Sequence, residues 1–94
     1  MKKLEEEVKK NGFTYRQVVR SDDVALYEQI DAQGILAGHE LFKIRVMPAG
    51  DVFGTKMPER EVMPKDADFG VTAWSVGIST ARAILKYAEL VTIL

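Results

Sequence analysis

Residues 13–47 decide the fold, and they read FTYRQVVRSDDVALYEQIDAQGILAGHELFKIRVM. Apolar side chains recur at every second position through much of this stretch, which is the period of a half-buried strand. Two clusters of turn residues, Ser21-Asp22-Asp23 and Ala32-Gln33-Gly34, divide it. The pattern predicts three strands, at residues 13–20, 24–30 and 35–47. Gly38 is a candidate bulge in the third strand. Consecutive strands joined by short turns form an antiparallel meander, so 13–47 is predicted to be one.

Both ends of the chain add predicted elements to this meander. Residues 71–77, which include Trp74, predict a fourth strand, and residues 79–94 a helix with Ser79 or Thr80 as its N-cap. Spacings of three and four residues predict the helix face that packs on the sheet: Ala81, Ile84, Leu85, Ala88 and Val91. Residues 1–12 predict a short peripheral helix, because acidic and basic side chains alternate at i,i+4 and Asn11-Gly12 is a typical helix stop.

The predicted fold is therefore α+β: one domain with an antiparallel sheet of about four strands, packed by the C-terminal helix. Residues 48–70 hold all three prolines and three of the seven glycines, yet they also carry several large apolar side chains. We expect an ordered loop along the sheet, with a short strand near Arg60–Met63.

Composition excludes several classes of protein. The 94 residues contain 13 basic and 14 acidic side chains, 47% hydrophobic residues and no cysteine. A polycation, a disordered acidic tail, a disulfide framework and a thiolate zinc site are excluded. The apolar runs are too short to span a membrane. Charged residues stand where a signal peptide needs an apolar stretch, so a cytoplasmic location is expected, in the host if the gene is phage-borne.

Motifs for catalysis and cofactor binding are weak in this sequence. Asp66, Asp68 and Gly70 match the opening of a calcium loop, but Gly77 stands where the bidentate acid is needed. His39 is the only histidine, and we expect it on the outer face of its strand rather than in a catalytic triad. The sequence predicts a non-enzymatic protein with no cofactor and no metal.

The loop over 48–70 is the leading candidate for binding another protein, because it is charge-dense and sits on a small scaffold. Its predicted contact residues are Phe53, Lys56, Glu59, Arg60 and Glu61.

Two alternatives use other parts of the chain. A nucleic-acid-binding face would combine basic and aromatic side chains from three predicted strands, namely Arg16, Lys43, Arg45 and Trp74. Acidic side chains outnumber basic ones by six to five in residues 40–68, which disfavours that alternative. A virion or assembly protein would form a homo-oligomer through the apolar end Leu90–Leu94.

Residues 53–75 contain a series of distinctive segments: Phe53-Gly54, Pro58-Glu59-Arg60-Glu61-Val62, Pro64, Asp68-Phe69-Gly70 and Ala73-Trp74-Ser75. With this pattern, residues 13–88 resemble a family of small uncharacterised proteins of phages, prophages and gut bacteria. Val76-Gly77-Ile78 departs from it, where the family pattern has an aromatic residue and a more acidic helix start. The resemblance implies no catalytic residue. It implies an accessory protein of a phage or mobile element that modulates a host or defence protein.

Overall fold

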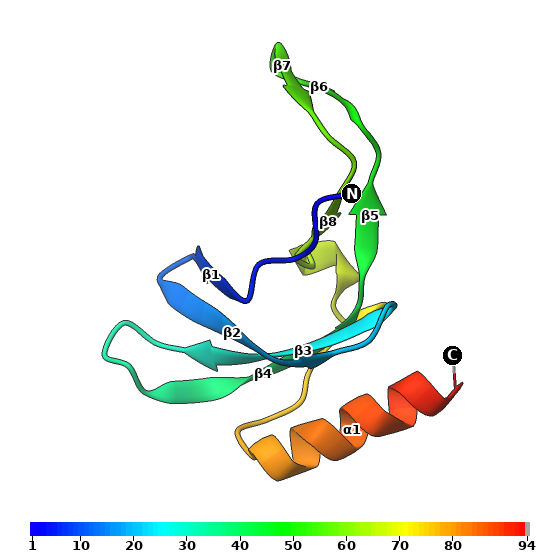
Figure 1. Cartoon of the computed structure of the whole chain (residues 1–94). Helices are drawn as coiled ribbons and strands as arrows, with labels where there is room; N and C mark the ends of the chain where they lie inside the picture. The colour runs from blue at the N-terminus through cyan, green and yellow to red at the C-terminus, as the bar shows by residue number, and fades with distance from the viewer. Residues whose placement is uncertain (94) are drawn as a thin grey trace.

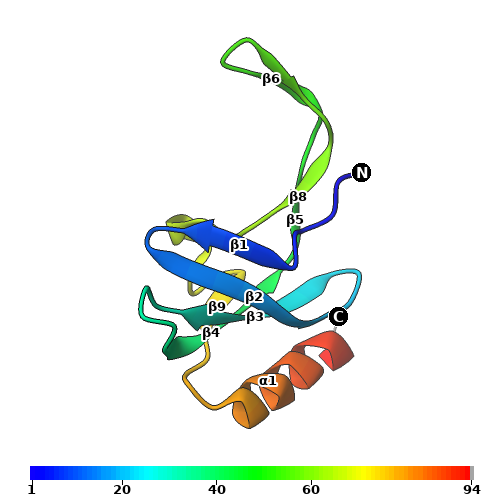
Figure 2. The same ribbon diagram turned by 60° about the vertical axis from the view of Figure 1, so that its left-hand side comes forward.

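One antiparallel sheet organises the chain, and the computed structural model describes residues 1–93. The sheet has five strands in the order β1-β2-β3-β4-β9 (Figures 1 and 2). These strands are β1 (Glu7–Lys10), β2 (Phe13–Arg20), β3 (Val24–Ile30), β4 (Leu36–Lys43) and β9 (Ala73–Ser75). Helix α1 (Thr80–Ile93) packs against β3 and β4. The predicted α+β class, an antiparallel sheet packed by a C-terminal helix, is confirmed.

The N-terminal segment differs from its prediction, because residues 7–10 form a strand rather than part of a peripheral helix. β1 pairs with β2, with Glu7 opposite Arg16 and Lys10 opposite Phe13. Between the strands, Asn11 and Gly12 have φ of 54° and 82°. Positive φ at both central positions is the mark of a type I′ hairpin turn, for which Asn-Gly is a preferred pair. A helix as short as the one predicted is marginal in water, whereas pairing with β2 satisfies the backbone.

The predicted strand over 35–47 is divided in two. β4 ends at Lys43, Ile44 N–H donates to the Asp23 carbonyl at 2.8 Å, and the chain leaves the sheet. The expected bulge lies beside Gly38. Gln29 is opposite Gly38 but Ile30 is opposite Leu36, so Ala37 has no partner in the β3 ladder. Four short elements then follow, β5 (Arg45–Met47), β6 (Gly50–Val52), β7 (Thr55–Met57) and β8 (Arg60–Val62), before the 3-10 helix η1 (Asp66–Asp68). β8 confirms the short strand predicted near Arg60–Met63.

The sheet has a core on each face, so the molecule has three layers (Figure 2). On one face, the rings of Tyr27 and Phe42 stack with their centroids 5.6 Å apart. Parts of the N-terminal segment and of the chain after β8 cover this core, through Leu4, Val8, Met63 and Phe69 among others. On the other face, Val24, Leu26 and Leu41 pack against Ala83 of α1.

Helix α1 turns a different face to the sheet from the one predicted. Ala83 is completely buried, and Tyr87, Leu90 and Val91 pack beside it. Of the five predicted residues only Val91 belongs to this face, while Ala81, Ile84, Leu85 and Ala88 are exposed. The small side chain of Ala83 lets the helix approach the strands closely. Ser79 is the N-cap, because its Oγ accepts the N–H of Arg82 at 3.2 Å.

Candidate functional site

A two-stranded arm, residues 45–62, projects from the sheet on the side opposite α1 (Figures 1 and 2). β5 pairs with β8 and β6 pairs with β7 in one continuous register, from Arg45 opposite Val62 to Val52 opposite Thr55. Pro48 and Pro58 lie between the two pairs, and proline has no N–H to continue a ladder. Most of the stretch predicted as a loop along the sheet is therefore a ribbon that extends away from it.

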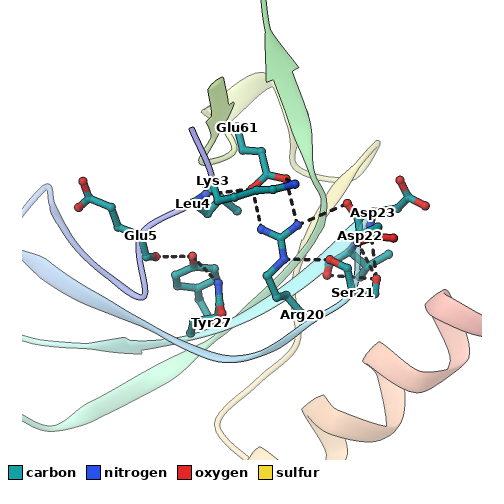
Figure 3. Close-up of polar contacts among 11 residues, drawn as sticks. Lys3, Leu4, Glu5, Arg20, Ser21, Asp22, Asp23, Tyr27 and Glu61 are labelled. Atoms are coloured by element: carbon teal, nitrogen blue, oxygen red, sulfur yellow. Dashed lines mark hydrogen bonds and ion pairs between the residues drawn. The ribbon is translucent and has the colours of Figure 1, made fainter. Parts of the chain in front are cut away.

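A buried ion pair fixes the base of the arm (Figure 3). Arg20, at the end of β2, donates Nη1 to Glu61 Oε1 at 2.6 Å and Nη2 to Oε2 at 2.9 Å. The Glu61 side chain, only 3% exposed, also accepts the N–H of Leu4 at 2.9 Å, and Lys3 Nζ lies 3.8 Å away. Chiefly through the bond from Arg20, the pKa of Glu61 falls to about 2, and the same contact raises the pKa of Arg20.

Backbone bonds from the N-terminal residues hold the arm from a second direction. Lys2 N–H donates to the Glu59 carbonyl at 3.1 Å, and Glu61 N–H donates to the Lys2 carbonyl at 2.8 Å. A few residues later, the Glu5 carbonyl accepts the hydroxyl of the core residue Tyr27 at 2.6 Å (Figure 3). The arm therefore leaves the domain from a base that is tied to both β2 and the N-terminal segment.

The tip of the arm exposes a phenylalanine in an unfavourable backbone conformation. Phe53 and Gly54 have φ of 51° and 80°, which repeats the turn formed by Asn11 and Gly12. A left-handed conformation costs an ordinary L-residue roughly 1–2 kcal/mol, and Asn rather than Phe is preferred there. The side chain of Phe53 is fully exposed, with a relative accessibility of 104%. It adds nothing to a core that could offset the strain.

The five predicted contact residues lie along this arm but differ in accessibility. Phe53 is at the tip, Lys56 is exposed on β7 opposite Asp51, and Glu59 is exposed next to β8. Arg60 is half-buried and donates to the Pro58 carbonyl at 3.2 Å. Glu61 is buried in its pair with Arg20, so it positions the arm instead of presenting a contact.

An apolar groove lies on the opposite side of the molecule, between β9 and the C-terminal half of α1. It has a volume of about 690 Å³ and is lined by Leu41, Trp74, Ser75, Val76, Arg82, Lys86, Glu89, Leu90 and Ile93. Trp74 and the apolar end are recognisable separately in the sequence, but no local pattern places them together. Of the predicted oligomer residues, Leu90 packs on the sheet, Ile93 is 78% exposed, and Leu94 lies outside the described residues.

The residues of the alternative nucleic-acid face are dispersed. Arg16 is on β2 and Trp74 on β9, with β3 and β4 between them. Arg16 Nε donates to Glu7 at 3.0 Å, and Arg45 Nε lies 3.7 Å from Asp68. Lys43 is exposed at the end of β4. Acidic side chains therefore pair with Arg16 and Arg45, and Trp74 lies beside α1.

His39 is buried rather than on an outer face, with only 1% of its surface exposed. Its Nδ1 lies 2.9 Å from the Gly77 carbonyl, which can only accept, so Nδ1 carries the proton. Nε2 then accepts the hydroxyl of Thr80 at 3.1 Å. The ring thus joins β4 to the start of α1. Within residues 1–93, no three His, Asp or Glu side chains gather in a way that could hold a metal ion.

Comparison with protein-family models, with curated proteins and with solved structures gives no match to this chain. The resemblance to small phage and gut-bacterial proteins therefore stays a prediction. In the part of the chain that the structure describes, no helix has the length and apolar character needed to cross a membrane.

Proposed function

We propose that this protein is a small non-enzymatic interaction module that binds another protein through the tip of its arm. The observation that carries the proposal is Phe53, a fully exposed aromatic side chain held at positive φ. Strained backbone persists where the surrounding structure over-determines it, and such residues cluster at binding sites. Large aromatic side chains are also the commonest anchors of protein interfaces.

The rest of the arm supports side-chain recognition rather than strand addition. Val46 and Val52 are 44% and 42% exposed and lie on the same face of the ribbon, since they are six residues apart in a continuous register. Val52 adds apolar area directly beside Phe53, and Val46 adds it near the base of the arm. Pro48 and Pro58 interrupt the edges along which another strand would pair, as they do in natural edge strands.

The resemblance to phage and mobile-element proteins leaves two classes of partner open. One is a host or defence protein that the module modulates. The other is a second copy of the chain in an assembly. The arm serves either class, because an exposed aromatic at the end of a projecting ribbon can enter an apolar pocket on any protein surface.

Site-specific photocrosslinking tests the proposal. A benzophenone analogue of phenylalanine at position 53, expressed in cells of the organism that carries the gene, should give one discrete adduct on illumination. The same analogue at position 35 is the control, because Ile35 is also an exposed apolar residue, at 63%, but lies in a turn of the sheet. Adducts that are equal at both positions, or absent at position 53, would contradict the assignment of Phe53 as the binding residue.

A further inference from the structure

The arm and the groove form a complementary pair on one chain. Five of the side chains that line the groove are apolar: Leu41, Trp74, Val76, Leu90 and Ile93. A volume of about 690 Å³ falls within the range of pockets that hold compact apolar ligands. Ile93 at its rim is 78% exposed, and the aromatic side chain at the arm tip is exposed as well. Each surface leaves apolar area in water that the other could cover.

We propose that Phe53 of one copy inserts into the groove between β9 and α1 of a second copy, so that chains join head to tail. This inference rests on the proposed function, since it takes Phe53 as the contact residue and names its partner. The arm leaves the sheet on the side opposite α1, so it points away from the groove of its own chain (Figures 1 and 2). The contact therefore forms between chains.

Charge around the two surfaces agrees with this pairing. On the arm, Asp51 and Lys56 face each other across β6 and β7, immediately behind the tip. At the groove, Arg82 and Lys86 precede Glu89 along α1, so the two basic side chains lie towards the helix N-terminus and the acidic one towards the C-terminus. We expect the arm to enter with Asp51 towards Arg82 and Lys86 and with Lys56 towards Glu89. The reversed orientation brings like charges together, so the charges select one direction of entry.

The symmetry of such a contact determines what forms. Arm and groove are different surfaces, so the interface is heterologous, and every added copy presents another free arm and another free groove. The assembly therefore grows with concentration, as an open chain or a closed ring. A hairpin tip buries little area, well below about 1,200 Å² in total, and such small interfaces are weak.

Two variants, each lacking one half of the contact, test the inference. Phe53→Asn removes the aromatic side chain and creates the Asn-Gly pair already present at residues 11–12. Ile93→Lys places a charge at the rim of the groove, on an exposed residue near the helix C-terminus, where a cation is tolerated. Leu85→Lys is the matched control, because Leu85 is 64% exposed on the same helix but outside the lining of the groove. Circular dichroism first checks that all three proteins are folded.

Sedimentation between about 10 µM and about 1 mM, the range of weak interfaces, then measures the mass. Wild type and Leu85→Lys should grow with concentration, whereas Phe53→Asn and Ile93→Lys should each stay monomeric. A mixture of these two should form dimers and nothing larger, because one variant keeps the groove and the other keeps the arm. A monomeric wild type, association that persists in Phe53→Asn, or a mixture without dimers would each overturn the inference. A monomeric wild type that still crosslinks from position 53 to a different protein would leave the proposed function standing.

Discussion

Replacing Glu61 with glutamine tests how the arm is held. The change keeps the shape of the side chain but removes the charge that Arg20 and the N–H of Leu4 contact. In the folded protein the pKa of Glu61 is about 2, against an ordinary value of 4.5, because Arg20 binds the carboxylate. One pKa unit corresponds to about 1.4 kcal/mol, so the ionised side chain adds about 3 kcal/mol to the free energy of unfolding at neutral pH.

The pH dependence has a definite sign. The folded pKa of Glu61 lies below the unfolded value, so its stabilisation is complete above about pH 4.5 and is lost as the pH falls towards 2. We expect Glu61→Gln to be less stable than wild type by about 3 kcal/mol at pH 7, and by only about 1 kcal/mol at pH 3. Urea unfolding followed by Trp74 fluorescence measures both differences. Burial raises the pKa of Glu40, but this residue titrates in both proteins and cancels in the comparison.

The neighbouring residue Glu59 supplies the control. It is exposed and lies two positions before Glu61, so Glu59→Gln removes the same charge without breaking the buried pair. Its stability should stay within about 0.5 kcal/mol of wild type, as for most surface changes. A loss of less than about 1 kcal/mol for Glu61→Gln at pH 7, or an equal loss at pH 7 and pH 3, would show that the ionised pair with Arg20 does not stabilise the fold in this way.

Two further predictions concern the turn at the arm tip and the face of α1. Phe53→Asn should raise the free energy of unfolding by about 0.5–1 kcal/mol, because Asn tolerates positive φ better and the lost ring is fully exposed. A thermal midpoint lower than that of wild type would show instead that Phe53 supports the fold. Ala83→Leu should lower the free energy of unfolding by about 1–3 kcal/mol by overpacking the contact between α1 and the sheet, whereas Ala81→Leu should leave it almost unchanged. Urea midpoints in the reverse order would show that the helix packs through the face predicted from the sequence.

The central strands could be predicted because their signals are local. Alternating side chains define β2, and turn residues bound β3, so both strands have the predicted limits. The end of β4 could not be read in this way. Ile44 and Val46 continue the alternation, but the chain turns out of the sheet after Lys43 to begin the arm. Alternation shows that a segment is extended, and it does not show which strand will be its neighbour.

Two segments had local patterns compatible with more than one structure. Asn11-Gly12 can end a helix or form a hairpin turn, and the alternative was decided by β2, which offered a partner to residues 7–10. In α1, Ala83, Tyr87, Leu90 and Val91 are spaced as suitably as the predicted set, because the helix is apolar on more than one side. In both cases the tertiary contact selected one of two permitted patterns.

The candidate site depends on contacts that are distant in sequence. Arg20 and Glu61 are 41 residues apart, and nothing near either residue indicates the pairing. The groove combines β9 with the end of α1, whose packing face was itself mispredicted. Phe53 could be selected as a candidate, since an exposed phenylalanine beside glycine would be an anchor for a protein partner. Its position at the tip of a projecting ribbon required the register of all four short strands.

The chain contains the same tight turn twice, and the difference between the two supports the proposed role of the arm. Asn11-Gly12 joins two strands of the sheet with the residues that this turn prefers, whereas Phe53-Gly54 closes the arm with a strained, exposed aromatic. Folding alone favours asparagine at both positions. At the other end of the arm, the pair of Glu61 with Arg20 ties β8 to the end of β2. A fixed base reduces the conformational entropy lost on binding, so the combination of a held base and a strained, exposed tip supports the proposal that the arm binds a partner.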